Sequence, residues 1–254
     1  MGRFENKVVA IAGGAGGIGS GVSLRLAAEG AAVMVGDINF EDARRVAAEI
    51  QASGGRATPF KLNIGDEANV IEFIDACVRL YGGLDGFHAN ALDASRREDD
   101  DDLTTMDLAT YDQMMGVNTR GFVLCTRYAV PQLLKRGGGA MLYTSSGAAY
   151  AGDGTRPVYA MSKSAVHALS RYVASRWGKQ GVRSNVIAPG LIVHAGVRAV
   201  LDEAALEKTL AGVKTPRLGE PEDIAAMAAM LLSDDGAFVT GQVISVDGGG
   251  TMRA

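Results

Sequence analysis

Short apolar runs alternate with longer segments of helical periodicity along the whole chain. Residues 8–12 (VVAIA) are apolar throughout, as expected for a strand that is buried on both faces. Residues 13–19 are rich in glycine, and Val22, Leu24, Leu26 and Ala27 then recur at helix-like spacing. This order predicts a strand, a tight turn and a helix, which together begin a βαβ unit.

The same alternation continues to the end of the chain and predicts one α/β domain over residues 1–254. We expect a doubly wound (Rossmann) fold, with a mostly parallel sheet and helices on both faces. No repeat, linker or low-complexity block suggests a second domain. The further predicted strands are residues 31–36, 57–62, 86–89, 140–144, 183–187 and 242–246. The further predicted helices are residues 41–52, 67–80, 108–115 running on through 122–134, a long helix that carries Tyr159 and ends near 178, and 221–232.

The glycine-rich turn predicts a dinucleotide site, because glycine lets the backbone approach a pyrophosphate at a helix N-terminus. The next strand ends at Asp37, which can accept hydrogen bonds from both hydroxyls of an adenosine ribose and would repel a 2′-phosphate. No basic residue lies in the turn before Gly17 or directly after Asp37, and Arg44 and Arg45 lie further on. The pattern favours NAD(H) over NADP(H). The alternative is that Asp37 is a helix N-cap or a turn residue.

Tyr159 and Lys163 are four residues apart in a predicted helix and therefore share one face of it. An ammonium beside a phenol stabilises the phenolate, which makes the phenol a candidate proton-transfer group near neutral pH. Such a pair also occurs on ordinary helix surfaces, so it is informative only together with the glycine turn.

With these motifs the chain resembles the short-chain dehydrogenases/reductases, in their single-domain branch, over essentially its whole length. The segments that match the family's motifs are residues 12–19 (AGGAGGIG), 89–92 (ANAL), 117–121 (VNTRG), 143–146 (YTSS), 159–163 (YAMSK), 185–190 (NVIAPG) and 239–249 (VTGQVISVDGG). Their order and spacing make the resemblance specific.

The resemblance implies roles for four side chains. Tyr159 would be the general base in alcohol oxidation and the general acid in ketone reduction. Lys163 would support the phenolate and bond the nicotinamide ribose, Ser146 would hold the substrate oxygen, and Asn118 would support a water linking Lys163 to solvent. Ser146, rather than Ser145, has the family's spacing to Tyr159. The alternative for Ser146 is a strand-end serine that only caps a turn. The alternative for Asn118 is a polar residue that bonds its own helix backbone.

The resemblance also implies a cofactor site for NAD(H). Asn63 stands where the family more often has aspartate, and its side chain would bond the adenine amino group. The implied cofactor-binding residues are Gly13, Gly17, Ile18, Gly19, Asp37, Ile38, Asn63, Ile64, Asn90, Ala91, Tyr159, Lys163, Pro189, Gly190 and Ile192.

Besides Asn63, four positions depart from the family pattern. Ala12 replaces a threonine whose hydroxyl helps to pin the glycine turn, and Ala89 and Leu92 replace an asparagine and a glycine. These changes fall around the central strands, where one can compensate for another. His194 stands where the family often has a threonine that bonds the nicotinamide carboxamide. The sequence leaves three alternatives for His194: that bond, a contact with the substrate, or a position in solvent.

Composition and charge exclude several classes of protein. The chain is 47% hydrophobic, enough for a large core, and its formal charge of −4 gives no reason to expect nucleic acid or a membrane as partner. Residues 1–6 lead directly into the first strand, which does not suit a signal peptide. Cys77 and Cys125 are expected to be buried and unpaired, and no His/Cys spacing suggests a metal. We therefore expect a cytoplasmic protein without disulfides.

Substrate recognition is the least determined feature. The acidic residues 98–102 indicate either a solvated loop entering a helix or a surface that steers a cationic substrate. Residues 191–214 have a helix-like apolar pattern, which predicts either a lid over the substrate or a packed surface helix. A mostly apolar pocket favours a neutral secondary alcohol or ketone. The candidate substrate-binding residues are Ala148, Tyr150, Asp153, Leu191 and His194.

Three hypotheses follow. The first is an NAD(H)-dependent oxidoreductase of a secondary alcohol or ketone. The second is an NADPH-dependent 3-oxoacyl-thioester reductase, which Asp37 disfavours. The third is a non-catalytic dinucleotide-binding module, which is disfavoured by the intact set of Asn118, Ser146, Tyr159 and Lys163. The resemblance further implies a homotetramer that pairs the helices near 108–134 and 157–178 and packs the C-terminal strand.

Overall fold

The computed structural model describes residues 2–152 and 154–252, and within them a single parallel sheet runs through the molecule. Its strand order is β3-β2-β1-β4-β5-β6-β7, and every neighbouring pair is parallel. The strands are β1 (Val8–Ala12), β2 (Ala32–Asp37), β3 (Arg56–Lys61), β4 (Gly86–Ala89), β5 (Gly139–Thr144), β6 (Val182–Pro189) and β7 (Val243–Val246). The predicted doubly wound fold is confirmed.

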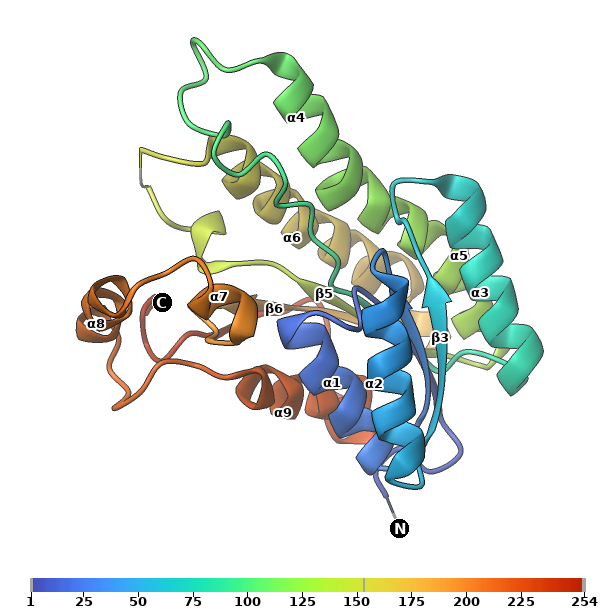
Figure 1. Ribbon diagram of the computed structural model, residues 1–254. Helices are drawn as coiled ribbons and strands as arrows, with labels where there is room; N and C mark the ends of the chain where they lie inside the picture. The colour runs from blue at the N-terminus through green and yellow to red at the C-terminus, as the bar shows by residue number, and fades with distance from the viewer. Residues whose placement is uncertain (1, 153, 253–254) are drawn as a thin grey trace.

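Helices cover both faces of this sheet (Figure 1). Val9 and Ile11 of β1 belong to the core on one face, and Val8 and Ala10 belong to the core on the other. Because both faces are buried, the central strands are apolar at successive positions instead of alternating. The helices on the first face are α1 (Gly17–Ala28), α2 (Phe40–Ala52) and α9 (Pro221–Leu232). Those on the second face are α3 (Glu67–Tyr81), α5 (Phe122–Lys135) and α6 (Pro157–Trp177).

The predicted helix over residues 108–134 is interrupted. α4 (Leu108–Met115) passes into a π-helical turn, Gly116–Gly121, before α5 begins. Apolar periodicity does not reveal this turn, because Met114 before it and Phe122 after it are both buried, as in an uninterrupted helix. Wide turns of this kind occur frequently at functional sites, and this one carries Asn118.

The apolar pattern near residues 195–210 forms two short helices. They are α7 (Ala195–Arg198) and α8 (Glu203–Gly212). Asp202 separates them, since its carboxylate accepts a hydrogen bond from the Ala205 N–H (2.8 Å) and caps α8. In Figure 1, α7 lies beside the start of α1, and α8 lies further out.

The strand order reverses between β1 and β4. β1 is followed outward by β2 and β3, whereas β4 begins the half of the sheet that leads to β7. The connections after β1 and β4 therefore diverge and leave a crevice at their carboxyl ends, where ligands bind in open α/β sheets.

Two further properties bear on the class of protein. No helix in the described part of the chain is both long enough and apolar enough to cross a bilayer. Cys77 and Cys125 are buried and unpaired, and burial raises the pKa of each thiol to about 12.

Candidate active site

A cavity of about 760 Å³ occupies the crevice at the strand carboxyl ends. All of the implied cofactor residues line it except Gly19. A Cβ atom at Gly19 would lie 1.8 Å from the Gly13 carbonyl oxygen, so this glycine is required for the turn to close. Gly13 has a φ of +79°, which favours glycine as well.

The glycine turn fits a pyrophosphate. α1 has no side-chain cap, so the N–H groups of its first turn are left for a ligand. Gly16 has no atom within 4 Å of an added Cβ and borders open space. At the neighbouring Gly17 the ring of His194 is the nearest group.

Asp37 lies at the end of β2 and lines the same cavity. Its carboxylate accepts hydrogen bonds from the N–H groups of Ala15 (3.1 Å) and Asn39 (3.1 Å). Asn39, not Asp37, is the N-cap of α2. Asp37 is therefore not the N-cap of α2, but its bond to the Asn39 N–H, two residues on, makes it a turn residue as well as a residue of the cavity.

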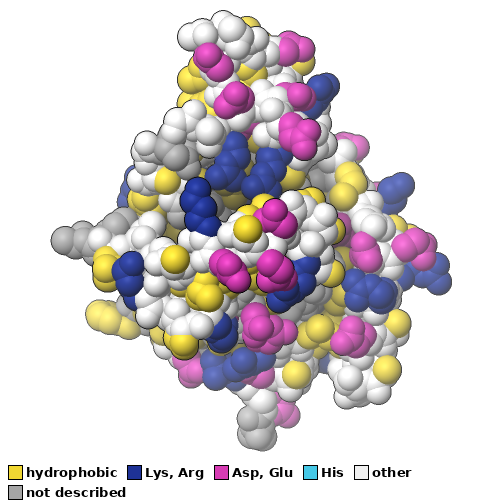
Figure 2. Space-filling view, turned by 60° about the vertical axis from the view of Figure 1, so that its left-hand side comes forward, with side chains coloured by type: hydrophobic (Ala, Val, Ile, Leu, Met, Phe, Trp, Pro, Cys, Tyr) yellow, Lys and Arg dark blue, Asp and Glu magenta, His cyan; other side chains and the backbone are white. Residues whose placement is uncertain are grey.

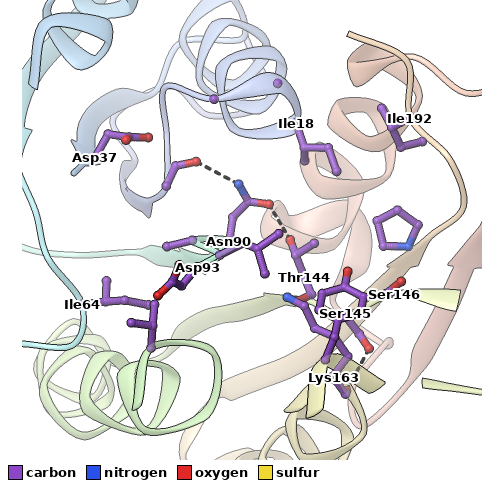
Figure 3. A pocket seen from close by; sticks show the side chains of 18 of the residues that line it. Ile18, Asp37, Ile64, Asn90, Asp93, Thr144, Ser145, Ser146, Lys163 and Ile192 are labelled. Atoms are coloured by element: carbon purple, nitrogen blue, oxygen red, sulfur yellow. Dashed lines mark hydrogen bonds between the residues drawn. The ribbon is translucent and has the colours of Figure 1, made fainter. Parts of the chain in front are cut away.

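A chain of hydrogen bonds joins the glycine turn to Lys163 (Figure 3). Asn90 donates from Nδ2 to the Gly13 carbonyl (2.8 Å), and the Thr144 hydroxyl donates to Asn90 Oδ1 (2.8 Å). His88 Nε2 lies 2.8 Å from the same hydroxyl, and Lys163 Nζ donates to the Thr144 carbonyl (3.0 Å). Thr144, at the end of β5, is thus connected to the glycine turn through Asn90 and directly to Lys163.

These hydrogen bonds explain how the glycine turn is held without a threonine at position 12. Ala12 and Ala89 are partners in the β1–β4 register, and both are completely buried. Neither offers a polar group, and Asn90 supplies the bond to the turn instead. No local sequence pattern marks Thr144, because its bond to Asn90 depends on the pairing of β4 with β5.

His88 and Lys163 are both buried beside Thr144. Burial, with the positive charge of Lys163 as a second cause, lowers the pKa of His88 to about 3, so its ring is neutral. Its Nδ1 has no hydrogen-bond partner among the described residues. Burial lowers the pKa of Lys163 to about 8. The Lys163 Nζ lies 5.8 Å from the centroid of the Tyr159 ring.

A second cavity, of about 460 Å³, adjoins the first. Ser146 and Tyr159 line both cavities and therefore stand where the two meet. Ser146 also accepts a hydrogen bond from the Ala148 N–H (3.1 Å), so it caps a turn as well as facing the cavities. Ala148 and Leu191, two of the candidate substrate residues, line the second cavity.

The other three candidate substrate residues lie elsewhere. Tyr150 does not line either cavity and packs its ring on His167, with centroids 5.0 Å apart. His194 lines the first cavity and not the second. Asp153 lies outside the described residues.

His194 caps α7 and lies across the glycine turn. Its Nδ1 accepts the Gly196 N–H (3.2 Å), and an added Cβ at Gly17 would lie 2.4 Å from its ring. Burial lowers the pKa of this imidazole. The ring lines the first cavity, which places it on the cofactor side of the site.

Asn118 projects from the π-helical turn to the segment that follows β4. Its Oδ1 accepts the Asp93 N–H (2.9 Å), and its Nδ2 donates to the Asp93 carbonyl (3.4 Å). The alternative that it bonds its own helix backbone is excluded. Asn118 holds Asp93, which lines both cavities.

The acidic run contains one buried residue, Asp100. Its two carboxylate oxygens accept the N–H groups of Val158 (2.9 Å) and Tyr159 (2.9 Å) in the first turn of α6. The expected favourable contact of an acid with a helix N-terminus exists, but with a distant helix. Arg97 and Arg156, which were not predicted as site residues, line the second cavity. The position of Arg156, three residues before Tyr159, was the available signal.

No group of three or more His, Cys, Asp or Glu residues within the described ranges is placed to hold a metal ion.

Comparisons with known proteins agree with this arrangement. The profile of the enoyl-(acyl carrier protein) reductase family matches residues 13–251. The chain is 40% identical to a probable short-chain type dehydrogenase/reductase of Bradyrhizobium diazoefficiens, covering 98% of this chain and 89% of the relative. It is 34% identical to the 7α-hydroxysteroid dehydrogenase of Bacteroides fragilis (100% and 97% covered) and 32% identical to a 3-oxoacyl-[acyl-carrier-protein] reductase of Thermotoga maritima (97% and 98%).

A solved structure of 7α-hydroxysteroid dehydrogenase complexed with NADH and 7-oxoglycochenodeoxycholic acid superimposes with a TM-score of 0.92. It is 31% identical, with 99% of this chain and 96% of that chain covered. The chain belongs to the short-chain dehydrogenase/reductase family, as the resemblance implied. It is accordingly an oxidoreductase that acts on CH–OH groups, with a fold that binds a nicotinamide dinucleotide.

Proposed function

We propose that the protein is an NAD(H)-dependent dehydrogenase/reductase of a secondary alcohol and its ketone, with Tyr159 as the general acid/base. The observation that carries the proposal is the junction of the two cavities, which Ser146 and Tyr159 line together. A dinucleotide in the first cavity and a substrate in the second would meet at these two hydroxyls. The bound nicotinamide would supply the site that accepts or gives the hydride.

The protein's own side chains would transfer the proton and orient the substrate. Ser146 would hold the substrate oxygen, and Tyr159 would exchange a proton with it. Lys163 has three N–H donors and one acceptor, the Thr144 carbonyl, among the described residues. Its other two N–H groups would donate hydrogen bonds to the phenolate and to the nicotinamide ribose. Asn118 would hold the segment that contains Asp93. It would also support a water that links Lys163 to solvent.

The choice of NAD(H) rests on the surroundings of Asp37. Its carboxylate lines the cavity and is bonded to backbone N–H groups alone. Arg44 and Arg45 pair with Glu41 and Asp42 on α2 (both 3.4 Å), and neither arginine lines the cavity. The NADH-bound structural relative supports the same cofactor.

A reduction of 3-oxoacyl thioesters with NADPH is the second candidate. The acyl-carrier-protein reductases among the relatives favour it. Lys61 favours this candidate as well, because it pairs with Asp37 in the β2–β3 register and offers a cation for a 2′-phosphate. Lys61 does not line the cavity, however, so the first proposal is preferred.

The test is reduction of NAD⁺ and of NADP⁺ over a panel of secondary alcohols that includes cyclohexanol and a 7α-hydroxysteroid. We expect turnover with NAD⁺, and a loss of about 10²- to 10⁴-fold in Tyr159→Phe. Turnover with NADP⁺ alone would favour the thioester reductase. Unchanged turnover in Tyr159→Phe would reject the assigned acid/base.

We also propose that the protein is a cytoplasmic homotetramer and that residues 191–214 form a lid. Val197 lines the first cavity, and Leu201 and Thr209 line the second, so this segment borders both. Leu108 and Val123 are exposed apolar residues on the helices expected to pair between subunits. Sedimentation tests the assembly: a monomer at micromolar concentration would contradict it.

A further inference from the structure

Two arginine side chains in the second cavity have no part in the chemistry proposed above. Arg97, after β4, and Arg156, directly before α6, line it together with Ser146 and Tyr159. Neither guanidinium forms an ion pair with any carboxylate of the described residues. Figure 2 shows Lys and Arg side chains gathered in a hollow on this side of the molecule.

Arg156 is held in an unfavourable backbone conformation. Its φ of +55° and ψ of +52° are left-handed, and it precedes Pro157, a position that disfavours helical backbone angles. The Arg156 N–H bonds the Asp100 carbonyl (3.1 Å), which helps to hold the turn. Strain of this kind concentrates at ligand-binding sites. Here it brings the guanidinium Cζ to 6.0 Å from the centroid of the Tyr159 ring.

The carboxylates in the same lining are already satisfied by the protein. Asp100 accepts two backbone N–H groups of α6, and Asp93 accepts the N–H of Ser95 (2.8 Å) and the side chain of Gln113 (2.9 Å). The two guanidinium groups, by contrast, have no acceptor among the described residues. The cavity therefore offers unused cationic donors and no unused anionic acceptor of comparable strength.

We propose that the substrate is a hydroxy or oxo carboxylate whose carboxylate binds Arg97 and Arg156. Its hydroxyl or carbonyl would then reach Ser146 and Tyr159, so the inference rests on the proposed function. The planar fork of a guanidinium matches a carboxylate, and two of them fix its orientation. Leu92, Met114 and Leu201 supply apolar walls for the carbon skeleton in between. The neutral molecule expected from the sequence is thereby replaced by one with a neutral reacting group and a remote anionic group.

The test is binding of small probes to the NADH-loaded protein, followed by nicotinamide fluorescence. Cyclohexanecarboxylate should bind on the order of 10- to 100-fold more tightly than neutral cyclohexanecarboxamide. Added salt should reduce this preference. The double variant Arg97→Gln/Arg156→Gln should bind both probes alike. Arg198→Gln is the matched control, because Arg198 pairs with Glu203 (3.7 Å) and lines neither cavity.

The outcomes separate this inference from the proposed function. Absence of NADH binding would count against the proposed function, whereas NADH binding with equal affinity for the two probes would overturn the carboxylate site. Inorganic phosphate, the third probe, should bind more weakly than the carboxylate. Tighter binding of phosphate would instead assign the arginines to a phosphate-bearing carrier. Arg97→Gln alone, on an exposed segment, keeps the test available should the Arg156 change unfold the protein.

Discussion

Lys163 of α6 is a buried cation, and its Nζ donates one hydrogen bond, to the Thr144 carbonyl at the end of β5. Burial lowers its pKa from 10.5 to about 8, so keeping the charge in the folded protein costs free energy. Because the folded-state pKa lies below the unfolded value, the unfolded chain binds the proton more strongly. The cost is fully present below a pH of about 8 and disappears as the pH rises towards 10.5.

Lys163→Met should reveal this cost in the cofactor-free protein. The stability of the variant relative to the wild type should fall by on the order of 3 kcal/mol as the pH rises through this window. Urea unfolding of both proteins across the pH range measures the difference. Cys77 and Cys125 also titrate at high pH, but they are common to both proteins and cancel. A difference that does not change with pH would contradict the assigned cause.

Thr144 links three partners through one hydroxyl and one carbonyl. Thr144→Val would leave Asn90 Oδ1 and His88 Nε2 without this partner and should cost about 1–3 kcal/mol of stability. It should also weaken NADH binding, because Asn90 holds the Gly13 carbonyl. Thr144→Ser keeps the hydroxyl and should stay within about 1 kcal/mol of the wild type. Equal losses in both variants, by denaturation and NADH titration, would refute the role of the hydroxyl.

At the scale of elements, α6 depends on a cap that comes from another segment. Arg156, its own N-cap residue, makes no side-chain capping bond, and Asp100 bonds the first-turn N–H groups instead. Because Tyr159 is in this turn, Asp100 is a positioning residue for it. The cap also places a negative charge at the positive end of the helix.

Asp100→Asn should lower stability by about 1–2 kcal/mol. It should also lower kcat without changing the Kd of NADH, since the displaced group is Tyr159 rather than the glycine turn. Asp101→Asn, an exposed neighbour, removes the same charge and should leave both quantities unchanged. If the two variants behaved alike, a general charge effect would replace the cap as the explanation.

The elements themselves were largely predictable. The buried strands are short apolar runs, and helices such as α3 combine an apolar face with an Asp66 cap and Gly82 at the C-terminus. Two details were not predictable. The π-helical turn leaves Met114 before it and Phe122 after it both buried, and the break at Asp202 lies within an apolar pattern that continues on both sides of it.

At the scale of the whole molecule, the first cavity spans the reversal of strand order and takes residues from both halves of the sheet. A cofactor bound there would hold the two halves together and stabilise the folded state by mass action. NADH at about 100 times its Kd should therefore raise stability by about 2.7 kcal/mol.

NADPH at the same concentration should stabilise much less, because Asp37 would repel the 2′-phosphate. Thermal unfolding with each cofactor measures the contrast. Asp37→Ala should reduce it. Equal stabilisation of the wild type by both cofactors would reject the preference for NAD(H).

The sequence by itself determined the order of strands and helices, the glycine turn, Asp37 at the end of β2, and the Tyr159/Lys163 pair. Each of these depends on residues within one element or in directly consecutive ones, where local periodicity and turn chemistry are sufficient. Only the tertiary structure decided how Thr144 reaches Asn90, which residue caps α6, and which cations share a cavity with Tyr159. The pairs Thr144–Asn90, Asp100–Tyr159 and Arg97–Tyr159 are each more than fifty positions apart, and strand pairing and packing, rather than any local pattern, bring them together.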